Sequence, residues 1–333
     1  MHYTYLGRSG LRVSRLCLGT MNWGPQTSEH EAFAIMDAAL DAGVTFFDTA
    51  NVYGWMGGPE PRHPGWTEEI IGRWFALGGG RRESVVLATK VHGDMRDPSD
   101  GPNALPGVSA FKIRRHLEGS LRRLQTDRIE LYQMHHINRH TPWDEIWGAY
   151  EALAGQGKIY YAGSSNFAAR HLCYAQNSAA KRHYLGLVSE QHKYSLLCRL
   201  PELEVLPTAQ DLGIGVICWS PLAGGLLGGH ALAASAGRHR TAAEVREMPE
   251  GRRTQLEAFA AVAKDVGESE ADIALAWLLA QPGVTAPIIG PRTLDQFKAS
   301  LHAVDLTLDE DTLCKLDDIF PGPGGEAPEA YAW

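Results

Sequence analysis

The sequence predicts an α/β fold, a single (β/α)8 TIM barrel over residues 1–333 with an N-terminal β-hairpin and an extra C-terminal helix and tail. Eight short apolar runs alternate with stretches of helical periodicity, and such alternation implies parallel strands joined by right-handed crossovers. No linker separates two halves of the chain, and barrels of this length commonly fold as one domain. An open, doubly wound sheet is the alternative arrangement of the same units.

The chain opens with two short strands and a first β-α unit. YTYLG-RSG-LRVSR predicts a hairpin with its turn at 8–10, followed by a buried strand around 16–19. Ser28 and Glu31 form a capping box, apolar residues follow at helical spacing, and Gly43 ends the helix.

The remaining units repeat this pattern along the chain. Strands are expected near 45–48, 84–90, 129–134, 159–164, 187–191, 214–219 and 285–289. Helices are expected over 67–76, 109–124, 142–154, 168–180, 201–211 and 253–280, with two more near 293–303 and 308–319. The basic stretch 228–253 is expected to be a long loop, and the tail after 319 either a frayed terminus or a packed flap.

Composition and charge exclude several classes of protein. Lys plus Arg number 31 against 39 for Asp plus Glu, so a net charge of −8 gives no field to hold a nucleic acid. Five scattered cysteines without a C-x-x-C pair favour reduced thiols, and no signal pattern opens the chain. Residues 212–229 lack charge, but their glycines favour a buried strand and loop over a membrane span. We therefore expect a soluble cytoplasmic protein with no membrane partner.

Residues that can do chemistry stand at three consecutive strand ends. Asp48 closes TFFDTA, Lys90 closes SVVLATK and His135 closes IELYQMH, while Tyr53 follows Asp48 on the next loop. Catalytic side chains of a barrel come from the C-terminal ends of its strands. A nearby lysine lowers the pKa of a tyrosine from about 10, a carboxylate keeps the lysine charged, and a histidine orients a carbonyl. Each residue alone has a structural explanation, but together they predict acid catalysis on a C=O group.

The same segments resemble a known family. GVTFFDTANVYG, VVLATKVHG, DRIELYQMHH, GSSNF, EQHKYSLL, WSPLAGGLL and IIGPRTLDQ occur in the order typical of the aldo-keto reductase superfamily, above all of its long forms, the potassium-channel β subunits and bacterial general reductases. The resemblance implies that Tyr53 is the general acid, that Lys90 and Asp48 tune it, and that His135 orients the substrate. His136 is the rival for the last role, but strand alternation is expected to turn it in another direction.

The resemblance also implies a nicotinamide dinucleotide bound across the barrel mouth. Arg292, just ahead of a helix N-terminus that favours an anion, predicts NADPH over NADH. A capping box of Thr293 and Gln296 is a purely structural explanation, and Ala299 and Ser300 replace the family's usual acidic-then-Asn pair. The implied cofactor residues are Thr20, Met21, Asp48, Ser165, Asn166, Gln191, Trp219, Ser220, Pro221, Leu222, Gly224, Gly225, Leu226, Gly290, Arg292, Thr293 and Gln296.

Aromatic residues are candidates for contacts with the nicotinamide and the substrate. Trp219 takes the place of an aromatic that stacks on the nicotinamide, with core packing as the alternative. Large aromatics near the mouth suggest an aromatic-walled pocket, although ordinary packing explains them equally well. The candidates for the substrate wall are Trp23, Trp55, His136 and Trp143, and those for a flap over it are Tyr331 and Trp333.

Together these residues predict an NADPH-dependent oxidoreductase that reduces a small carbonyl substrate, an aldehyde or ketone, to an alcohol without a metal. Tyr53 would protonate the oxygen as hydride arrives from the nicotinamide. A non-catalytic NADPH-binding regulatory subunit is the alternative, although all four catalytic residue types are present. A metal-dependent barrel hydrolase is a third hypothesis, but the first strand, RLCLG, lacks an H-x-H ligand pair.

Overall fold

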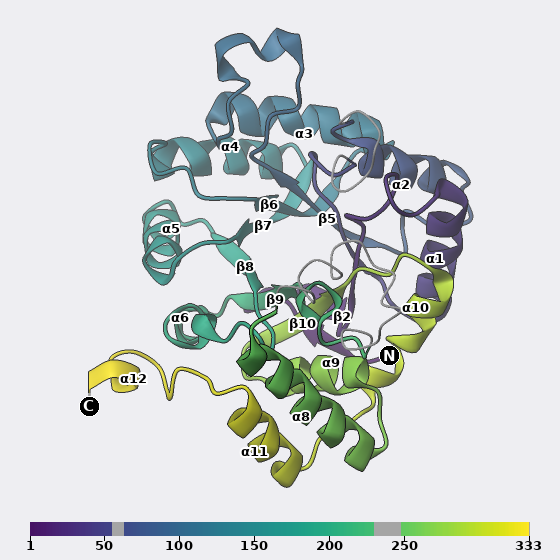
Figure 1. Cartoon of the computed structure of the whole chain (residues 1–333). Coiled ribbons are helices and arrows are strands. Elements are labelled where there is room, and N and C mark those ends of the chain that lie inside the picture. Colours follow the sequence, from purple (N-terminus) through teal and green to yellow (C-terminus); the bar gives the residue numbers. More distant parts are fainter. Residues whose placement is uncertain (55–62, 230–247, 333) are drawn as a thin grey trace.

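The computed structural model describes residues 1–54, 63–229 and 248–332 (Figure 1). Its centre is a closed barrel of eight parallel strands in chain order, in which the last strand pairs with the first. The strands are β3 (Cys17–Gly19), β4 (Phe46–Asp48), β5 (Val86–Val91), β6 (Ile129–Met134), β7 (Ile159–Ser165), β8 (Leu187–Lys193), β9 (Gly215–Trp219) and β10 (Val284–Ile289). The predicted (β/α)8 barrel is confirmed, and the open sheet is excluded.

Helices surround the barrel, as Figure 1 shows in a view into the ring of strands. The α-helices are α1 (Glu29–Asp41), α2 (Trp66–Ala76), α3 (Ala110–Leu124), α4 (Trp143–Gly155), α5 (Ala169–Lys181), α6 (Val205–Asp211), α8 (Glu250–Val266), α9 (Glu270–Ala280), α10 (Leu294–Ala299), α11 (Glu310–Ile319) and α12 (Glu329–Ala332). Short 3-10 turns are η1 (Pro98–Asn103), η2 (Leu200–Glu202), η3 (Ala223–Gly225) and η4 (His302–Val304). None of the helices in the described ranges is long and apolar enough to cross a membrane.

Three helix predictions need correction. The stretch 253–280 is two helices, because Gly267 ends α8 at a φ of 82° and Ser269 caps α9 by accepting from the Asp272 N–H. Residues 293–303 form only α10 and the 3-10 turn η4, and residues 201–211 begin as the 3-10 turn η2 before α6. Helical periodicity alone therefore overestimated the length of these helices.

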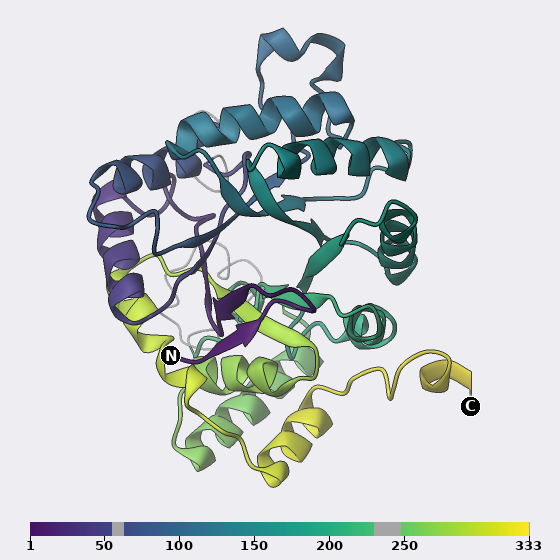
Figure 2. The ribbon, with the colours of Figure 1, turned by 180° about the vertical axis from the view of Figure 1, so that it is seen from behind.

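The N-terminal hairpin closes one end of the barrel. Strands β1 (Tyr3–Tyr5) and β2 (Arg12–Ser14) pair antiparallel, and Figure 2 shows them across the barrel opening. Leu6 and Val13 are fully buried there. They pack against inward-facing side chains of the barrel, namely Cys17, Phe46, Ala88, Leu131, Val188, Ile217 and Ala286. Apolar side chains thus fill this end of the barrel. Polar side chains that take part in chemistry are therefore expected at the opposite end, where the strands have their C-terminal ends.

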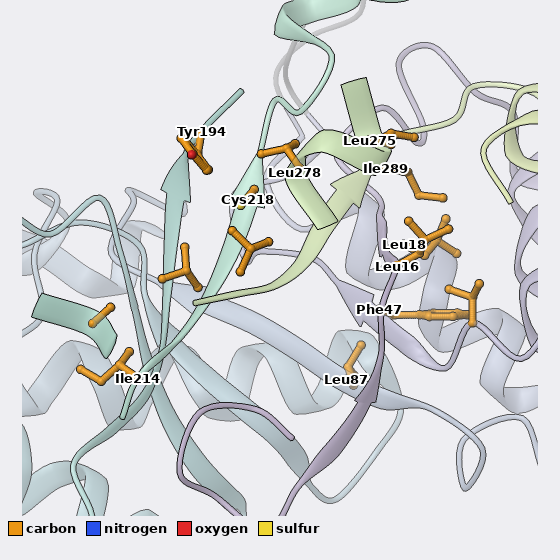
Figure 3. Packing of buried hydrophobic residues seen from close by; sticks show 14 of the residues in the cluster. Leu16, Leu18, Phe47, Leu87, Tyr194, Ile214, Cys218, Leu275, Leu278 and Ile289 are labelled. Carbon is orange, nitrogen blue, oxygen red and sulfur yellow. The ribbon is translucent and has the colours of Figure 1, made fainter. Parts of the chain in front are cut away.

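The larger core lies between the strands and the helices. Cys17 faces the barrel interior, whereas its neighbours Leu16 and Leu18 belong to the outer core, as the twofold period of a strand requires. Figure 3 shows part of this outer layer, where Leu275 of α9 lies near Ile289 of β10. These two layers fix the register of the strands and hence the positions of the residues at their C-terminal ends.

Candidate active site

A fully buried lysine is at the centre of the candidate active site. The Nζ atom of Lys90 donates to Asp48 Oδ1 at 2.5 Å, to the carbonyl oxygen of Thr49 at 2.9 Å and to Tyr53 Oη at 3.1 Å. Strand register explains the meeting, because Asp48 pairs with Ala88, two residues before Lys90 on the next strand. The sequence-predicted aspartate, lysine and tyrosine are therefore brought into direct contact.

Two glutamines hold the other oxygen of the aspartate. Asp48 Oδ2 accepts from Gln133 Nε2 at 2.9 Å and from Gln191 Nε2 at 2.7 Å. The role of Gln133 was missed in the sequence, although it is a polar residue near the end of the apolar strand β6, where it pairs in register with Lys90 of β5. Gln191 was expected to bind a cofactor carboxamide, but its amide nitrogen is engaged with Asp48, which leaves its oxygen for such a contact.

Burial and charge oppose each other in this array. Burial lowers the pKa of Lys90, but the charges of Asp48 and Tyr53 and their hydrogen bonds outweigh it, so the net pKa is raised and the amine stays charged. Burial raises the pKa of Tyr53 above 10, and the charge of Lys90 offsets this only in part. The prediction that Lys90 lowers the pKa of Tyr53 below 10 is therefore wrong. The phenol stays protonated, which is the state that can donate a proton.

Three histidines line the cavity beside the tyrosine. The rings of His135 and Tyr53 meet edge to face with centroids 5.9 Å apart, and His136 stacks on His135 at 5.0 Å. The expected divergence of His135 and His136 is wrong because β6 ends at Met134, so strand alternation no longer applies. Burial, and then the positive charge of Lys90, hold the pKa of His135 well below its usual range, so its imidazole is neutral.

His92 lies beside His136, with ring centroids 5.2 Å apart. Burial lowers the pKa of His92 to about 4, so this ring is also neutral near pH 7. Within the described part of the chain, no group of three or more His, Cys, Asp or Glu side chains is arranged to hold a metal ion.

A cavity of about 1480 Å³ opens above the reaction centre. Most of the predicted cofactor residues line it. They are Thr20, Met21, Asp48, Ser165, Asn166, Gln191, Trp219, Ser220, Pro221, Leu222, Gly224, Gly225, Leu226, Gly290, Arg292 and Gln296. Thr293 is not among the lining residues, because its side chain caps α10.

Hydrogen bonds fix the aromatic platform of this cavity. Asn166 takes a left-handed φ of 62°, and its Nδ2 donates to the His135 carbonyl at 3.2 Å and to Ser165 Oγ at 3.0 Å. Its Oδ1 accepts from Trp219 Nε1 at 3.1 Å, and Lys193 Nζ lies 5.6 Å from the centre of a Trp219 ring. Trp219 lines the cavity and is only partly buried. Its held indole is suited to stack against a planar ring.

The loop after β9 has an unusual backbone. Ser220, Ala223, Gly224 and Gly225 all take positive φ angles, of 58°, 49°, 71° and 105°. Such conformations cost non-glycine residues roughly 1 kcal/mol or more and cluster at ligand sites. A Cβ added to Gly224 would meet no protein atom within 4 Å, so open space lies over this turn. The loop therefore leaves room for a ligand group that lies close to its backbone.

The far end of the cavity is built differently from the prediction. The N–H of Gln296 donates to Thr293 Oγ1 at 3.3 Å, and the N–H of Arg292 donates to Gln296 Oε1 at 3.0 Å. The N–H of Leu294 donates to Glu31 Oε1 at 2.6 Å, so Glu31 does not complete the predicted capping box at Ser28. The N–H groups of Arg292, Leu294 and Gln296 are thus engaged and α10 has only six residues, so its N-terminus gives no support to the predicted anion site. The charge of Arg292 remains as the feature suited to a phosphate.

The predicted aromatic wall is wrong for the two tryptophans that the structure describes. Trp23 is fully buried in the core, and Trp143 stacks on Trp147, so neither lines the cavity. Trp55 and Trp333, most of the basic stretch 228–253, and the Tyr331 side chain lie outside the described residues. The described lining near Tyr53 mixes polar residues, namely His92, Asp94, Arg96 and His136, with apolar ones, namely Val52, Pro64 and Pro106.

The tail does not line the cavity within the described residues. After α11 it runs outside the ring of helices toward α6 (Figure 1), where the Ala327 N–H donates to the Leu203 carbonyl at 2.9 Å. The described walls of the cavity are therefore formed by the strand ends and the loops that follow them.

Comparison with known proteins agrees with this geometry. The model of the aldo/keto reductase family matches residues 15–320. The chain is 63% identical over 100% of both proteins to an uncharacterized oxidoreductase, YrpG, of Bacillus subtilis. It is 33% identical to protein tas of Escherichia coli, over 97% of this chain and 100% of that protein, and 33% identical to a probable voltage-gated potassium channel subunit beta of Oryza sativa, over 92% of each. These matches support a general role as an oxidoreductase. The chain belongs to the aldo/keto reductase family.

Proposed function

We propose that this protein is an NADPH-dependent oxidoreductase that reduces an aldehyde or ketone to an alcohol, with Tyr53 as the general acid. The observation that carries this proposal is the buried contact of Asp48, Lys90 and Tyr53 at the floor of the cavity. A cavity of about 1480 Å³ exceeds the roughly 300–1,000 Å³ of ordinary small-molecule pockets, as a dinucleotide together with a substrate requires.

Tyr53 and Lys90 have different roles in proton transfer. Tyr53 Oη donates its proton to the carbonyl oxygen as that oxygen gains negative charge. The phenolate that remains lies 3.1 Å from the Lys90 ammonium, whose positive charge stabilises it. Asp48 keeps Lys90 charged, so the phenolate forms directly beside a cation.

The neutral His135 orients the substrate. An uncharged imidazole donates a hydrogen bond to a carbonyl oxygen without competing with Tyr53 for the proton, because its pKa is held well below the usual range. Its ring meets Tyr53 edge to face, so a carbonyl oxygen can lie near both donors.

The residues beyond this centre fit a nicotinamide dinucleotide. Trp219 offers a stacking face, the backbone of 220–226 offers a close approach for the diphosphate, and Arg292 offers a positive charge for a 2′-phosphate. When bound, the nicotinamide supplies the hydride. The preference for NADPH over NADH in this proposal rests on Arg292.

A regulatory subunit that binds NADPH without turnover is the second candidate. The name of the Oryza sativa relative favours it, since that protein is described as a channel subunit. The presence of all four catalytic residues, with Lys90 bonded to both Asp48 and Tyr53 and with His135 beside them, favours the enzyme.

Steady-state NADPH oxidation with a panel of carbonyls distinguishes the two functions. We expect multiple turnovers with at least one of methylglyoxal, glyceraldehyde and nitrobenzaldehyde. NADPH binding measured by tryptophan fluorescence, with no more than one oxidation per protein molecule across the panel, would instead favour the regulatory subunit.

A further inference from the structure

A second buried polar network lies beside the reaction centre and shares no side-chain hydrogen bond with it. His116 of α3 is 5% exposed and lies between Asp100 of η1, which is 2% exposed, and the fully buried Asn51 of the loop after β4. Its Nε2 is 3.0 Å from Asp100 Oδ2, and its Nδ1 is 3.2 Å from Asn51 Nδ2. One imidazole thus joins two loops that both line the cavity.

Donor chemistry fixes the direction of these hydrogen bonds. The amide nitrogen of Asn51 can only donate, so Nδ1 of His116 accepts and the ring proton is on Nε2, where it donates to Asp100. Burial lowers the pKa of His116 although Asp100 opposes this effect, so the ring is neutral near pH 7. Arg115 Nε donates to Asp100 Oδ1 at 2.5 Å and balances the carboxylate charge.

The first loop, residues 49–54, carries Tyr53. Its backbone is tied to β5, because the Asn51 N–H donates to the Lys90 carbonyl at 3.2 Å and the Thr49 carbonyl accepts from Lys90 Nζ. Among the described residues, the only hydrogen bond of the Asn51 side chain is the one to His116, and its buried Oδ1 has no partner. The imidazole is therefore what holds this side chain, two residues from the catalytic phenol.

The second loop, residues 92–108, is fixed by the same face of α3. Lys112, one turn before His116, is almost fully buried, and its Nζ donates to the carbonyls of Gly93, Ala104 and Leu105 at 3.2, 3.0 and 2.5 Å. The two loops also pack closely, since a Cβ at Gly93 would lie 2.2 Å from Cγ1 of Val52. The helix, the second loop and the Tyr53 loop are thus held together as one unit.

We propose that His116 is a positioning residue for the reaction: through Asn51 it holds the Tyr53 loop in the place where the phenol meets Lys90. Asp100 acts behind it by fixing the imidazole and its proton. The reaction itself rests on the function proposed above, and His116 contacts neither substrate nor cofactor in this account.

A matched pair of substitutions separates the two hydrogen bonds of the imidazole. In His116→Asn the amide oxygen takes the place of the accepting Nδ1, whereas in His116→Gln the amide nitrogen takes the place of the donating Nε2. We expect His116→Gln to lower kcat about tenfold or more, since small displacements of catalytic groups have such effects, and His116→Asn to stay within about threefold of the wild type. NADPH affinity stays unchanged in both variants.

Hydrogen exchange gives a readout that needs no turnover. The amides of Asn51 and Tyr53 donate to Lys90 and Ala50, and we expect them to exchange faster in His116→Gln but not in His116→Asn. If the wild type oxidises no NADPH with any carbonyl, the proposed function fails while this comparison still tests the positioning role.

Glu130→Gln is the control for a general loss of stability. Glu130 is 7% exposed near the start of β6, away from the mouth, and it forms an ion pair with Arg82 at 2.9 Å. We expect this variant to lower the melting temperature without changing kcat or exchange in residues 49–54. The proposal is overturned if folded His116→Gln keeps wild-type kcat and exchange, or if His116→Asn loses as much activity as His116→Gln.

Discussion

The two ends of the cavity use polar residues in opposite ways. At the inner end, Asp48, Lys90 and Tyr53 come from strand ends or the adjoining loop, and Lys90 bonds directly to the other two. At the outer end, the side chains of Glu31 and Gln296 bond to backbone N–H groups and close turns around a six-residue helix. Register decides where a strand-end side chain points, whereas a loop side chain has many possible partners. Chemistry is therefore easier to infer from residue identity at the inner end.

After loss of the acid itself, the largest expected effect comes from removing the inner cation. Lys90→Met leaves Asp48 and Tyr53 buried without their shared partner, so the phenolate formed in the reaction loses its stabilising charge. We expect kcat to fall about a hundredfold or more, within the range of roughly 10²- to 10⁴-fold for general acid catalysis. Stopped-flow NADPH oxidation measures this, and retention of more than about a tenth of the wild-type rate would show that Lys90 does not support the acid.

The pH dependence of stability should also originate at the inner end and in the His116 network beside it. Burial lowers the pKa values of His92, His116, His135 and His136, so the folded protein keeps these rings neutral while the unfolded chain protonates them below about 6.5. The contribution of these four rings to stability is therefore fully present above pH 6.5, and it is lost as the pH falls from 6.5 toward 4. We expect the melting temperature to decrease between about pH 6.5 and 5, before most carboxylates titrate. A melting temperature that is flat over this interval would contradict the neutral, buried rings.

At the outer end, Arg292→Leu tests the phosphate contact. Removal of the guanidinium should raise the Kd for NADPH about tenfold or more, because a charge-assisted contact contributes roughly 1.5–3 kcal/mol. The Kd for NADH should change by less than about threefold, since NADH lacks the 2′-phosphate. Titration of tryptophan fluorescence measures both constants, and equal weakening of the two cofactors would mean that Arg292 only supports the loop.

A smaller effect is expected for Glu31, for which the sequence predicts only a place in a helix cap. Its carboxylate accepts a hydrogen bond from the N–H of Leu294, two residues after Arg292. This places a negative charge near the proposed phosphate site. Glu31→Gln keeps an acceptor and removes the charge, so the Kd for NADPH should fall about two- to fivefold, as for a single charge near a helix end. An unchanged ratio of NADPH to NADH affinity would show that the Glu31 carboxylate does not interact with the 2′-phosphate of NADPH.

Much of the fold was predictable because strand and helix patterns are local. All eight barrel strands were expected within two residues of their observed bounds, since an apolar run between turn residues is a strong signal. Helix breaks were harder to predict. Gly267 ends one helix and Ser269 begins the next within three residues, and the apolar periodicity across them hid the break.

The site divides in the same way. Asp48, Lys90, Tyr53 and His135 meet as expected because consecutive parallel strands bring their ends together. The pKa of Tyr53 was predicted in the wrong direction, because burial of the phenol depends on packing that no motif contains. Trp23 resembles a mouth residue in the sequence but is buried in the core, where the next residue, Gly24, packs closely against Trp66 of α2.

The central claim is that the buried array supplies the proton through Tyr53, and Tyr53→Phe tests it most directly. This variant keeps the ring and removes one hydroxyl, so NADPH should still bind with a Kd within about threefold of the wild type. Hydride transfer measured in a single turnover, with NADPH and a carbonyl that the wild type reduces, should fall about a thousandfold. A variant that binds NADPH normally and still transfers hydride at close to the wild-type rate would contradict the account.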